Sequence, residues 1–157
     1  MVTVIDSQKE LVDMIIANWN ATNTSNVTPN IGKITDFPFE FQFGDGKGFV
    51  LIYSVSENEN IAGIGLTTQA DISESFKIDL RYGGMGTLSV SVIETRFLQY
   101  KTELKRILYS NRVNPTPNYC ILDLDNKTIT NLSNRTKKFY REVREVGLDD
   151  NNRDLTV

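Results

Sequence analysis

The sequence FPFEFQFGDGKGFVLIYSV, residues 37–55, carries the strongest structural signal in the chain. Aromatic or aliphatic side chains occupy every second position on both sides of a glycine-rich centre, residues 44–48. Because the side chains of a strand point alternately to opposite faces, this period of two predicts two strands, each with one apolar face. The glycine-rich loop predicts a hairpin, in which the facing pairs are Phe43 with Phe49, Phe41 with Leu51, Phe39 with Tyr53 and Phe37 with Val55.

Helical patterns flank this β-rich stretch. A helix is expected to start after a cap at Ser7, with Glu10 as the capping-box partner, and to carry apolar residues at helical spacing as far as Trp19. A second helix is expected after a cap at Thr87 or Ser89, ending near residue 110. Both helices have one apolar stripe, as helices that pack on a sheet do.

Further strands follow from the same alternation. One is predicted at 76–82, and a second hairpin at 119–124 and 128–132. The segment 138–148 fits either a helix or a bulged strand, and the sequence leaves it open. The fold class is therefore α+β, an antiparallel or mixed sheet of about 4–6 strands packed against an N-terminal helix and one long central helix.

Chain length predicts a single domain, residues 1–157. The Asn- and Thr-rich composition of 20–35 and the glycine-broken pattern around 57–75 predict flexible loops there, and 149–157 is expected to be a mobile tail. No signal peptide, membrane span or membrane contact is expected from the sequence.

Composition argues against most enzyme classes. The chain has no histidine, which excludes a Ser-His-Asp triad, a Cys-His pair and any histidine-ligated metal. Its one cysteine, Cys120, excludes a disulfide within the chain and a multi-cysteine metal site. The protein is therefore expected not to be an enzyme and to need no cofactor or metal.

Two motifs suggest chemistry that their context does not support. Residues 44–48, GDGKG, lack the spacing of a phosphate-binding P-loop and join two predicted strands, so a hairpin turn is the better interpretation. Residues 119–128, YCILDLDNKT, resemble the Asp-x-Asp motif of haloacid-dehalogenase-type phosphatases. In that motif one of the two carboxylates, here Asp123 and Asp125, would attack phosphorus, and both would help to hold magnesium. The threonine falls one place late and too little chain follows for the parallel sheet of that family, so a hairpin is favoured again.

Charge is distributed unevenly along the chain. Residues 1–78 contain 4 basic and 10 acidic side chains, whereas residues 79–157 contain 13 basic and 10 acidic ones. The first part therefore has a net charge of −6 and the second of +3. Such polarity suits head-to-tail contact between copies or contact with a charged partner, and it fits a solvated surface equally well.

The order of these elements resembles a known family. An amphipathic helix leads into a polar loop and a hairpin, and the strand ending FKIDLR at 76–81 turns into the helix ending LKRIL at 104–108. The chain closes with KFYREVREV at 138–146. This pattern is similar to the tail-terminator, or tail-completion, proteins of tailed bacteriophages and archaeal tailed viruses. The glycine-rich insertion at 61–66 and the asparagine-rich loop depart from the family, so contacts made by loops are not carried over.

The resemblance implies a structural virion protein without catalytic activity. Such subunits assemble as a ring, commonly a hexamer, which caps the tail tube and joins it to the head-completion or connector proteins of the neck. It also implies synthesis in the host cytoplasm, a place in the virion at the tail–neck junction, and DNA passing through the lumen without sequence-specific binding. Partner contacts are expected at Asp45, Lys47, Arg81, Lys137 and Lys138, with tube contacts on the loops 44–48 and 61–75.

Three other functions stay open from the sequence. The chain also fits another neck or baseplate adaptor of a tailed virus. A small nucleic-acid-binding α+β protein would use the basic cluster around Lys137 and Lys138. A magnesium phosphohydrolase would use Asp123 and Asp125.

Overall fold

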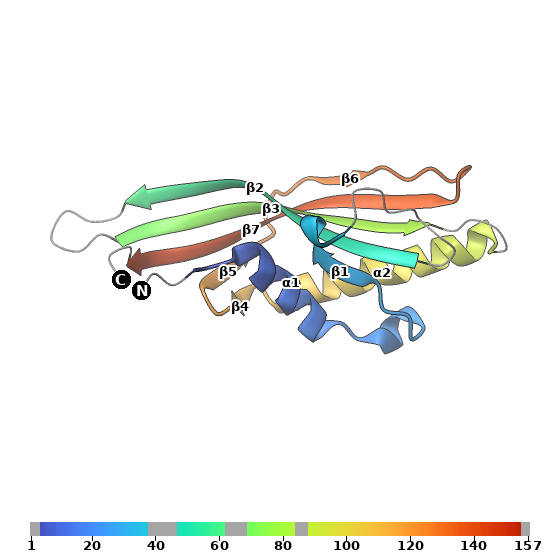
Figure 1. Cartoon of the computed structure of the whole chain (residues 1–157), viewed down its shortest axis with the longest axis horizontal. Helices are drawn as coiled ribbons and strands as arrows, with labels where there is room; N and C mark the ends of the chain where they lie inside the picture. The colour runs from blue at the N-terminus through green and yellow to red at the C-terminus, as the bar shows by residue number, and fades with distance from the viewer. Residues whose placement is uncertain (1–3, 38–46, 62–68, 84–87, 155–157) are drawn as a thin grey trace.

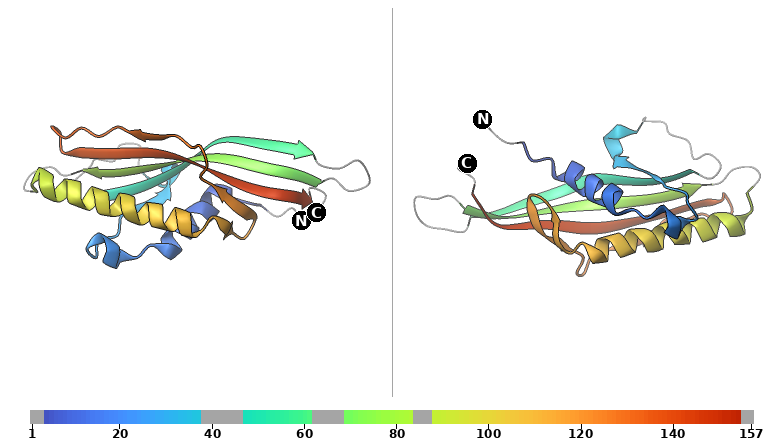
Figure 2. Two further views of the ribbon diagram at one scale, coloured as in Figure 1. Left: turned by 180° about the vertical axis from the view of Figure 1, so that it is seen from behind. Right: turned by 90° about the horizontal axis from the view of Figure 1, so that it is seen from below.

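A computed structural model describes residues 4–37, 47–61, 69–83 and 88–154. The fold is α+β: a twisted mixed sheet has two α-helices on one of its faces (Figures 1 and 2). The strands lie in the order β1-β2-β3-β7-β5-β4, and β6 also pairs with β7. The predicted α+β class is thus confirmed, whereas the sheet has seven strands among the described residues rather than the predicted 4–6.

Three long strands form the centre of the sheet. They are β2 (Lys47–Ile61), β3 (Gln69–Gly83) and β7 (Phe139–Asp154), and each neighbouring pair is antiparallel. The short strand β1 (Asn30–Lys33) runs parallel to β2 on its outer side. The segment 138–148, which the sequence left open, is therefore strand from Phe139 onward.

The helices begin at short polar side chains. Asp6, rather than the predicted Ser7, caps α1 (Ser7–Asn18), since its Oδ1 accepts a hydrogen bond from the Lys9 amide at 3.0 Å. Ser89 caps α2 (Val90–Ser110) through the Val92 amide at 3.3 Å. Short 3-10 helices, η1 (Ala21–Thr24) and η2 (Ile34–Asp36), lie on either side of β1.

The core lies between the helices and one face of the sheet. Alternation along β3 places four apolar side chains on that face, and all four are almost completely buried: Phe76, Ile78, Leu80 and Tyr82. α1 contributes Leu11 and Ile15, and α2 contributes the stripe predicted from its periodicity, with Ile93, Phe97, Tyr100, Leu104, Ile107 and Leu108 buried.

The predicted hairpin within 37–55 is not the pairing of β2. At Phe49–Ile52 one edge of β2 is paired with β1 and the other with β3, so Phe49 and Leu51 already have strand neighbours on both sides. Phe37 ends η2, and its ring packs edge-on against Phe49 with centroids 5.7 Å apart instead of facing Val55. The other predicted partners, at 39, 41 and 43, lie outside the described residues.

The predicted hairpin at 119–132 is also wrong. β4 (Val113–Thr116) and β5 (Tyr119–Asp123) form a hairpin, while β5 and β6 (Ile129–Asn131) both pair with β7. β5 lies beside Gly147–Asp149 and β6 beside Glu142–Arg144, so the two strands follow one another along one edge of β7. The alternating apolar residues of β5 and β6 therefore reflect the pairing of each strand with β7, not the pairing of the two strands with each other.

Two predicted loops are also corrected. Residues 57–61 and 69–75 are strand in β2 and β3, and 62–68 lie outside the described residues. Within 20–35 the chain forms η1, β1 and the start of η2, and β7 continues to Asp154, into the predicted tail. The polar segments that form strands are held by backbone hydrogen bonds to a long neighbouring strand. Such a ladder satisfies the backbone N–H and C=O groups whatever the side chains are.

Candidate interaction surfaces at the two ends of the sheet

One end of the sheet projects beyond both helices. We call this three-stranded segment the arm; it consists of residues 54–61 of β2, 69–75 of β3 and 147–154 of β7. It extends on the side where the two chain termini lie, whereas α2 runs along the other part of the sheet (Figures 1 and 2). A projecting segment of this kind offers its surface to a partner.

The arm is strongly acidic. Its strands contain seven carboxylates and one arginine, Arg153. Glu57 and Glu59 share a face of β2, and Glu57 lies directly opposite Glu74 of β3. Burial, followed by the charges of Glu74 and Glu59, raises the pKa of Glu57, as expected for like charges that lie across a strand pair.

The outer edge of the arm is open. β1 pairs with β2 only over Phe49–Ile52, so residues 54–61 have no strand on that side among the described residues. Their side chains are all exposed, including Val55 at 52% and Ile61 at 71%. Carboxylates on an open edge oppose uncontrolled strand pairing, while the two aliphatic side chains remain available for contact.

The opposite end of the sheet is basic. The register places Lys47 beside Gly83 and Gly83 beside Phe139, so the start of β2, the end of β3 and the start of β7 lie in one row. Lys137 is exposed in the turn before β7, and Lys138 has a φ of 52° and donates from Nζ to the Leu88 carbonyl at 3.0 Å. We call this region the basic end.

The structure thus brings most of the predicted interface residues to one region. Lys47, Lys137 and Lys138 lie at the basic end, and Arg81 lies two residues before the end of β3. Asp45 lies outside the described residues. Arg81 is turned toward its own sheet, since its guanidinium forms an ion pair with Asp79 at 2.7 Å.

The C-terminal half of α2 presents a third surface, which the sequence analysis did not find. Thr102, Lys105, Arg106 and Tyr109 line an apolar hollow of about 320 Å³. Lys105 Nζ and the guanidinium carbon of Arg112 each lie 5.8 Å from the centre of the Tyr109 ring. We call these five residues the α2 patch; the spacing of Lys105 and Tyr109, four residues apart in a helix, was the signal available.

Two of the cations in the α2 patch have no anionic partner in the part of the chain that the structure describes. Arg106 pairs with Glu103 and also donates to the Asn18 carbonyl at 2.8 Å. Neither Lys105 nor Arg112 has a carboxylate within ion-pair distance among the described residues. Tyr109 is 48% exposed, so the patch combines free positive charge with accessible apolar surface.

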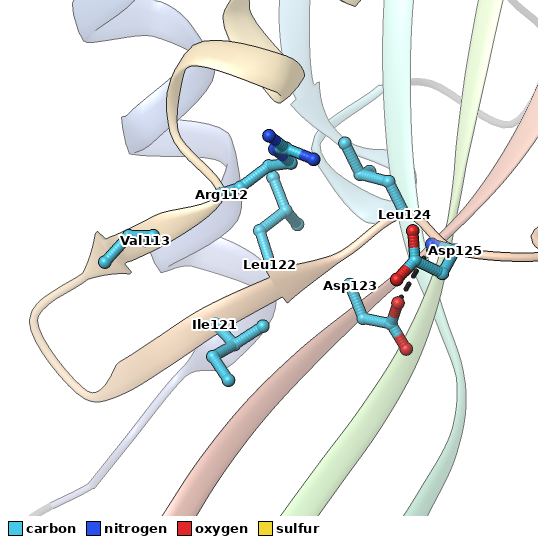
Figure 3. Close-up of a pocket in the computed structure, with 7 residues that line it drawn as sticks. All are labelled: Arg112, Val113, Ile121, Leu122, Asp123, Leu124 and Asp125. Carbon is cyan, nitrogen blue, oxygen red and sulfur yellow. Dashed lines mark hydrogen bonds between the residues drawn. The ribbon is translucent and has the colours of Figure 1, made fainter.

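A second hollow contains the carboxylates of the phosphatase-like motif. It measures about 270 Å³ and lies beside β5 (Figure 3), lined by Arg112, Val113, Ile121, Leu122, Asp123, Leu124 and Asp125. Asp123 Oδ1 accepts a hydrogen bond from the Asp125 amide at 2.9 Å, and its Oδ2 lies 3.6 Å from Lys127 Nζ. Asp123 therefore stabilises the loop after β5, as the side chain of a turn residue does.

The surroundings of Asp123 do not match a phosphatase site. Both neighbours of β5, β4 and β7, are antiparallel to it, whereas the phosphatase motif needs a parallel sheet. Within the described residues, no group of three or more cysteine, aspartate or glutamate side chains is placed to hold a metal ion.

Neither the helices nor comparisons with known proteins point to a further property of the chain. None of the described helices is long and apolar enough to cross a lipid bilayer. No protein-family model matches the sequence, and a search of curated proteins finds no match.

Proposed function

We propose that this protein is a tail terminator, a subunit of a closed ring that caps the tail tube of a tailed virus and joins it to the neck. The observation that carries the proposal is the acidic arm at one end of the sheet and the basic end at the other. The order of elements that resembles the terminator family supports it, and α2 would be the long central helix of such a subunit.

A ring requires a subunit with two different, complementary surfaces. In a ring the same contact repeats head to tail, so a surface on one flank must fit another surface on the next subunit. A self-complementary patch would instead give a closed dimer. The acidic arm supplies one such surface, and its complement on the next subunit would be a positively charged surface other than the basic end, so that each contact joins opposite charges.

The basic end is the proposed contact for the other virion components. Lys137 is exposed there and makes no ion pair with a described residue, so its charge is available to a partner. Arg135 and Glu94 form an exposed ion pair beside it at 3.2 Å. In this proposal the arm faces neighbouring subunits and the basic end faces the tube or the connector.

The experiment is assembly of the purified protein, measured by native mass and by negative-stain images. The expected result is closed rings with a narrow distribution of subunit number. A second readout is the joining of heads to tails in an extract that lacks the protein. A strict monomer at high concentration that also fails to restore joining would overturn the proposal.

Variants of single exposed lysines test the role of the basic end. Lys137→Glu is expected to form rings but to restore joining poorly, because the ring contact lies elsewhere. Lys9→Glu is the matched control, since Lys9 is an exposed lysine on α1, 62% accessible, whose partner Asp13 is four residues away. Equal joining by both variants would remove Lys137 from the proposed interface.

A further inference from the structure

We infer that the arm of one subunit binds the α2 patch of the next, so that Glu57, Glu59 and Ile61 of one copy contact Lys105, Arg112 and Tyr109 of another. This inference rests on the proposed ring and names the surfaces that close it.

The arm supplies two carboxylates and an aliphatic side chain on one face. Glu57, Glu59 and Ile61 alternate along β2 and therefore point the same way. Neither glutamate forms an ion pair with a described residue, and Ile61 is 71% exposed. From Glu57 to Ile61 this row spans about 13 Å, at roughly 3.3 Å per residue.

The α2 patch has the complementary composition. It offers two cations without a carboxylate partner among the described residues, Lys105 and Arg112, each 5.8 Å from the centre of the exposed Tyr109 ring. Its hollow of about 320 Å³ is apolar, shallow and open to solvent, and an aliphatic side chain such as Ile61 would cover it. Two cations that lack an ion-pair partner among the described residues, beside an apolar hollow, thus correspond to two exposed carboxylates beside an exposed isoleucine.

The partner of the α2 patch belongs to another copy of the chain. The ladder between β3 and β7 continues into the arm without a register shift at Phe76 and Val146. β2 has a bulge between Ser54 and Ser56 at this level but stays paired with β3, so the sheet sets the direction of the arm. It extends away from the part of the sheet that α2 covers (Figures 1 and 2). An arm held in this direction meets the α2 patch of a neighbour, not its own.

Bringing the surfaces together also relieves repulsion within the arm. The pKa of Glu57 is raised by burial and then by the nearby charges of Glu74 and Glu59. Cations from a neighbour would offset the repulsion among these carboxylates. The contact is therefore expected to weaken as the salt concentration rises.

Charge reversal at both surfaces tests the contact. The arm variant is Glu57→Lys with Glu59→Lys, and the patch variant is Lys105→Glu with Arg112→Glu. Each alone is expected to weaken self-association by at least about 100-fold, because like charges then meet at the contact. A control for the arm variant is Asp13→Lys with Asp36→Lys, which makes the same change in net charge as the arm variant at exposed sites outside both surfaces and should form rings normally.

The decisive measurement is whether rings form again when the reversed charges of the two surfaces are combined. An equimolar mixture of the arm and patch variants is expected to form rings of alternating subunits, since each arm then meets a patch of opposite charge. The protein with all four substitutions should form rings by itself. Circular dichroism and thermal unfolding check that every variant is folded.

The outcomes separate this inference from the proposed function. Rings from the unaltered protein that persist in both reversed variants would overturn the arm contact while leaving the ring intact. Loss of rings in both variants without restoration in the mixture would also overturn it. A monomeric unaltered protein that does not join heads to tails would overturn the proposed function, and the contact with it.

Discussion

Arg141 donates two hydrogen bonds to the carboxylate of Asp79, from Nε to Oδ1 at 3.0 Å and from a terminal nitrogen to Oδ2 at 2.9 Å. Arg81 forms a third at 2.7 Å, and Asp79 itself is completely buried. These side chains lie on the face of the sheet away from the helices, because Asp79 alternates with the core residues Ile78 and Leu80. A buried carboxylate with two arginines joins β3 to β7 independently of the apolar core.

Asp79→Asn is expected to destabilise the protein. The substitution leaves two guanidinium groups without their anion, and both keep some access to water, which limits the cost to about 2–3 kcal/mol. Denaturant unfolding measures the difference. Arg141→Lys keeps the charge but loses the paired geometry and should cost less, about 1 kcal/mol. An unchanged midpoint for Asp79→Asn would show that the cluster does not stabilise the fold.

Gly48→Ala is expected to disrupt the contact between β2 and α2. A Cβ at Gly48 would lie 3.1 Å from Cδ2 of Tyr100 and closer still to Cε2. Tyr100 has no room to move, since it is buried and its ring packs against Trp19 and Tyr82, with centroids 6.0 and 5.3 Å away. The cost should be about 1–3 kcal/mol by thermal or denaturant unfolding. Adding Tyr100→Leu should recover part of it, and no recovery would argue against this clash.

Glu103→Gln is expected to release the asparagine-rich segment from α2. The Glu103 carboxylate is buried and accepts hydrogen bonds from the Asn20 amide at 3.2 Å and from Asn23 Nδ2 at 2.6 Å. Removing the charge should cost about 1–2 kcal/mol and speed hydrogen exchange around residues 20–24. Lys9→Gln, at an exposed site, serves as the control, and unchanged exchange in the Glu103 variant would contradict the prediction.

The lowered pKa of Glu103 also predicts that the protein loses stability in acid. Burial opposes ionisation of Glu103, but hydrogen bonds from Arg106, Asn23 and Asn20 outweigh it and lower its pKa below 4.5. A carboxyl with a lowered pKa stabilises the fold above its unfolded-state value and loses that contribution as the pH falls through its folded-state value. Between neutral pH and acid, Glu103→Gln should therefore lose less stability than the unaltered protein.

Alkaline pH should destabilise the protein through Tyr100. Burial, with a smaller effect of Tyr82, raises the pKa of Tyr100 from 10.0 to about 12. The unfolded chain then loses this proton first, so the free energy of unfolding falls as the pH rises from 10.0 toward 12, by up to about 1.4 kcal/mol per pH unit. The measurement is denaturant unfolding at several alkaline pH values.

Tyr100→Phe provides the comparison for the alkaline prediction. The Tyr100 hydroxyl has no hydrogen-bond partner among the described residues, so its removal should leave stability at neutral pH unchanged or higher. Above pH 10 this variant should lose stability less steeply, although Tyr119, whose pKa is also raised to about 12, still contributes. Identical pH slopes for both proteins would rule out Tyr100 as a source of the effect.

Local periodicity in the sequence predicted the helices and strands whose apolar side chains pack in the core. β3 and α2 follow from the spacing of their apolar residues alone, and Ser89 marks the start of α2. The pairing of β2 did not follow, because alternation specifies which face of a strand is apolar but not which strand lies beside it. The parallel neighbour β1 carries only four residues and no strong pattern of its own.

β7 was ambiguous because its core-facing row contains charges. Glu142 and Arg144 occupy positions on the helix side of the sheet where apolar residues are expected, between Tyr140 and Val146. They are accommodated because Arg144 bonds to Glu142 at 3.3 Å and Lys101 of α2 pairs with Glu142 at 3.0 Å. A partner on a distant helix is not visible in a local pattern.

Of the two end surfaces, the basic end could be predicted from the sequence and the arm could not. The lysines of the basic end stood out as a charge cluster in the sequence, and the register then brought Lys47 to the same end. The arm was expected to be a loop, because its Ser-, Glu- and Asn-rich strand has little apolar character of its own. Its structure depends on the backbone ladder with β3, which is a tertiary effect.

The unbroken central strands also determine how this subunit would bear a load. Within the described residues β3 is paired with β2 on one side and with β7 on the other along its length, with one register shift in each ladder. A pull between the arm and the opposite end acts along these strands, so their hydrogen bonds are sheared together rather than opened one after another. Tension entering at either end therefore crosses the subunit through the backbone ladders, and the loops and helices carry little of it.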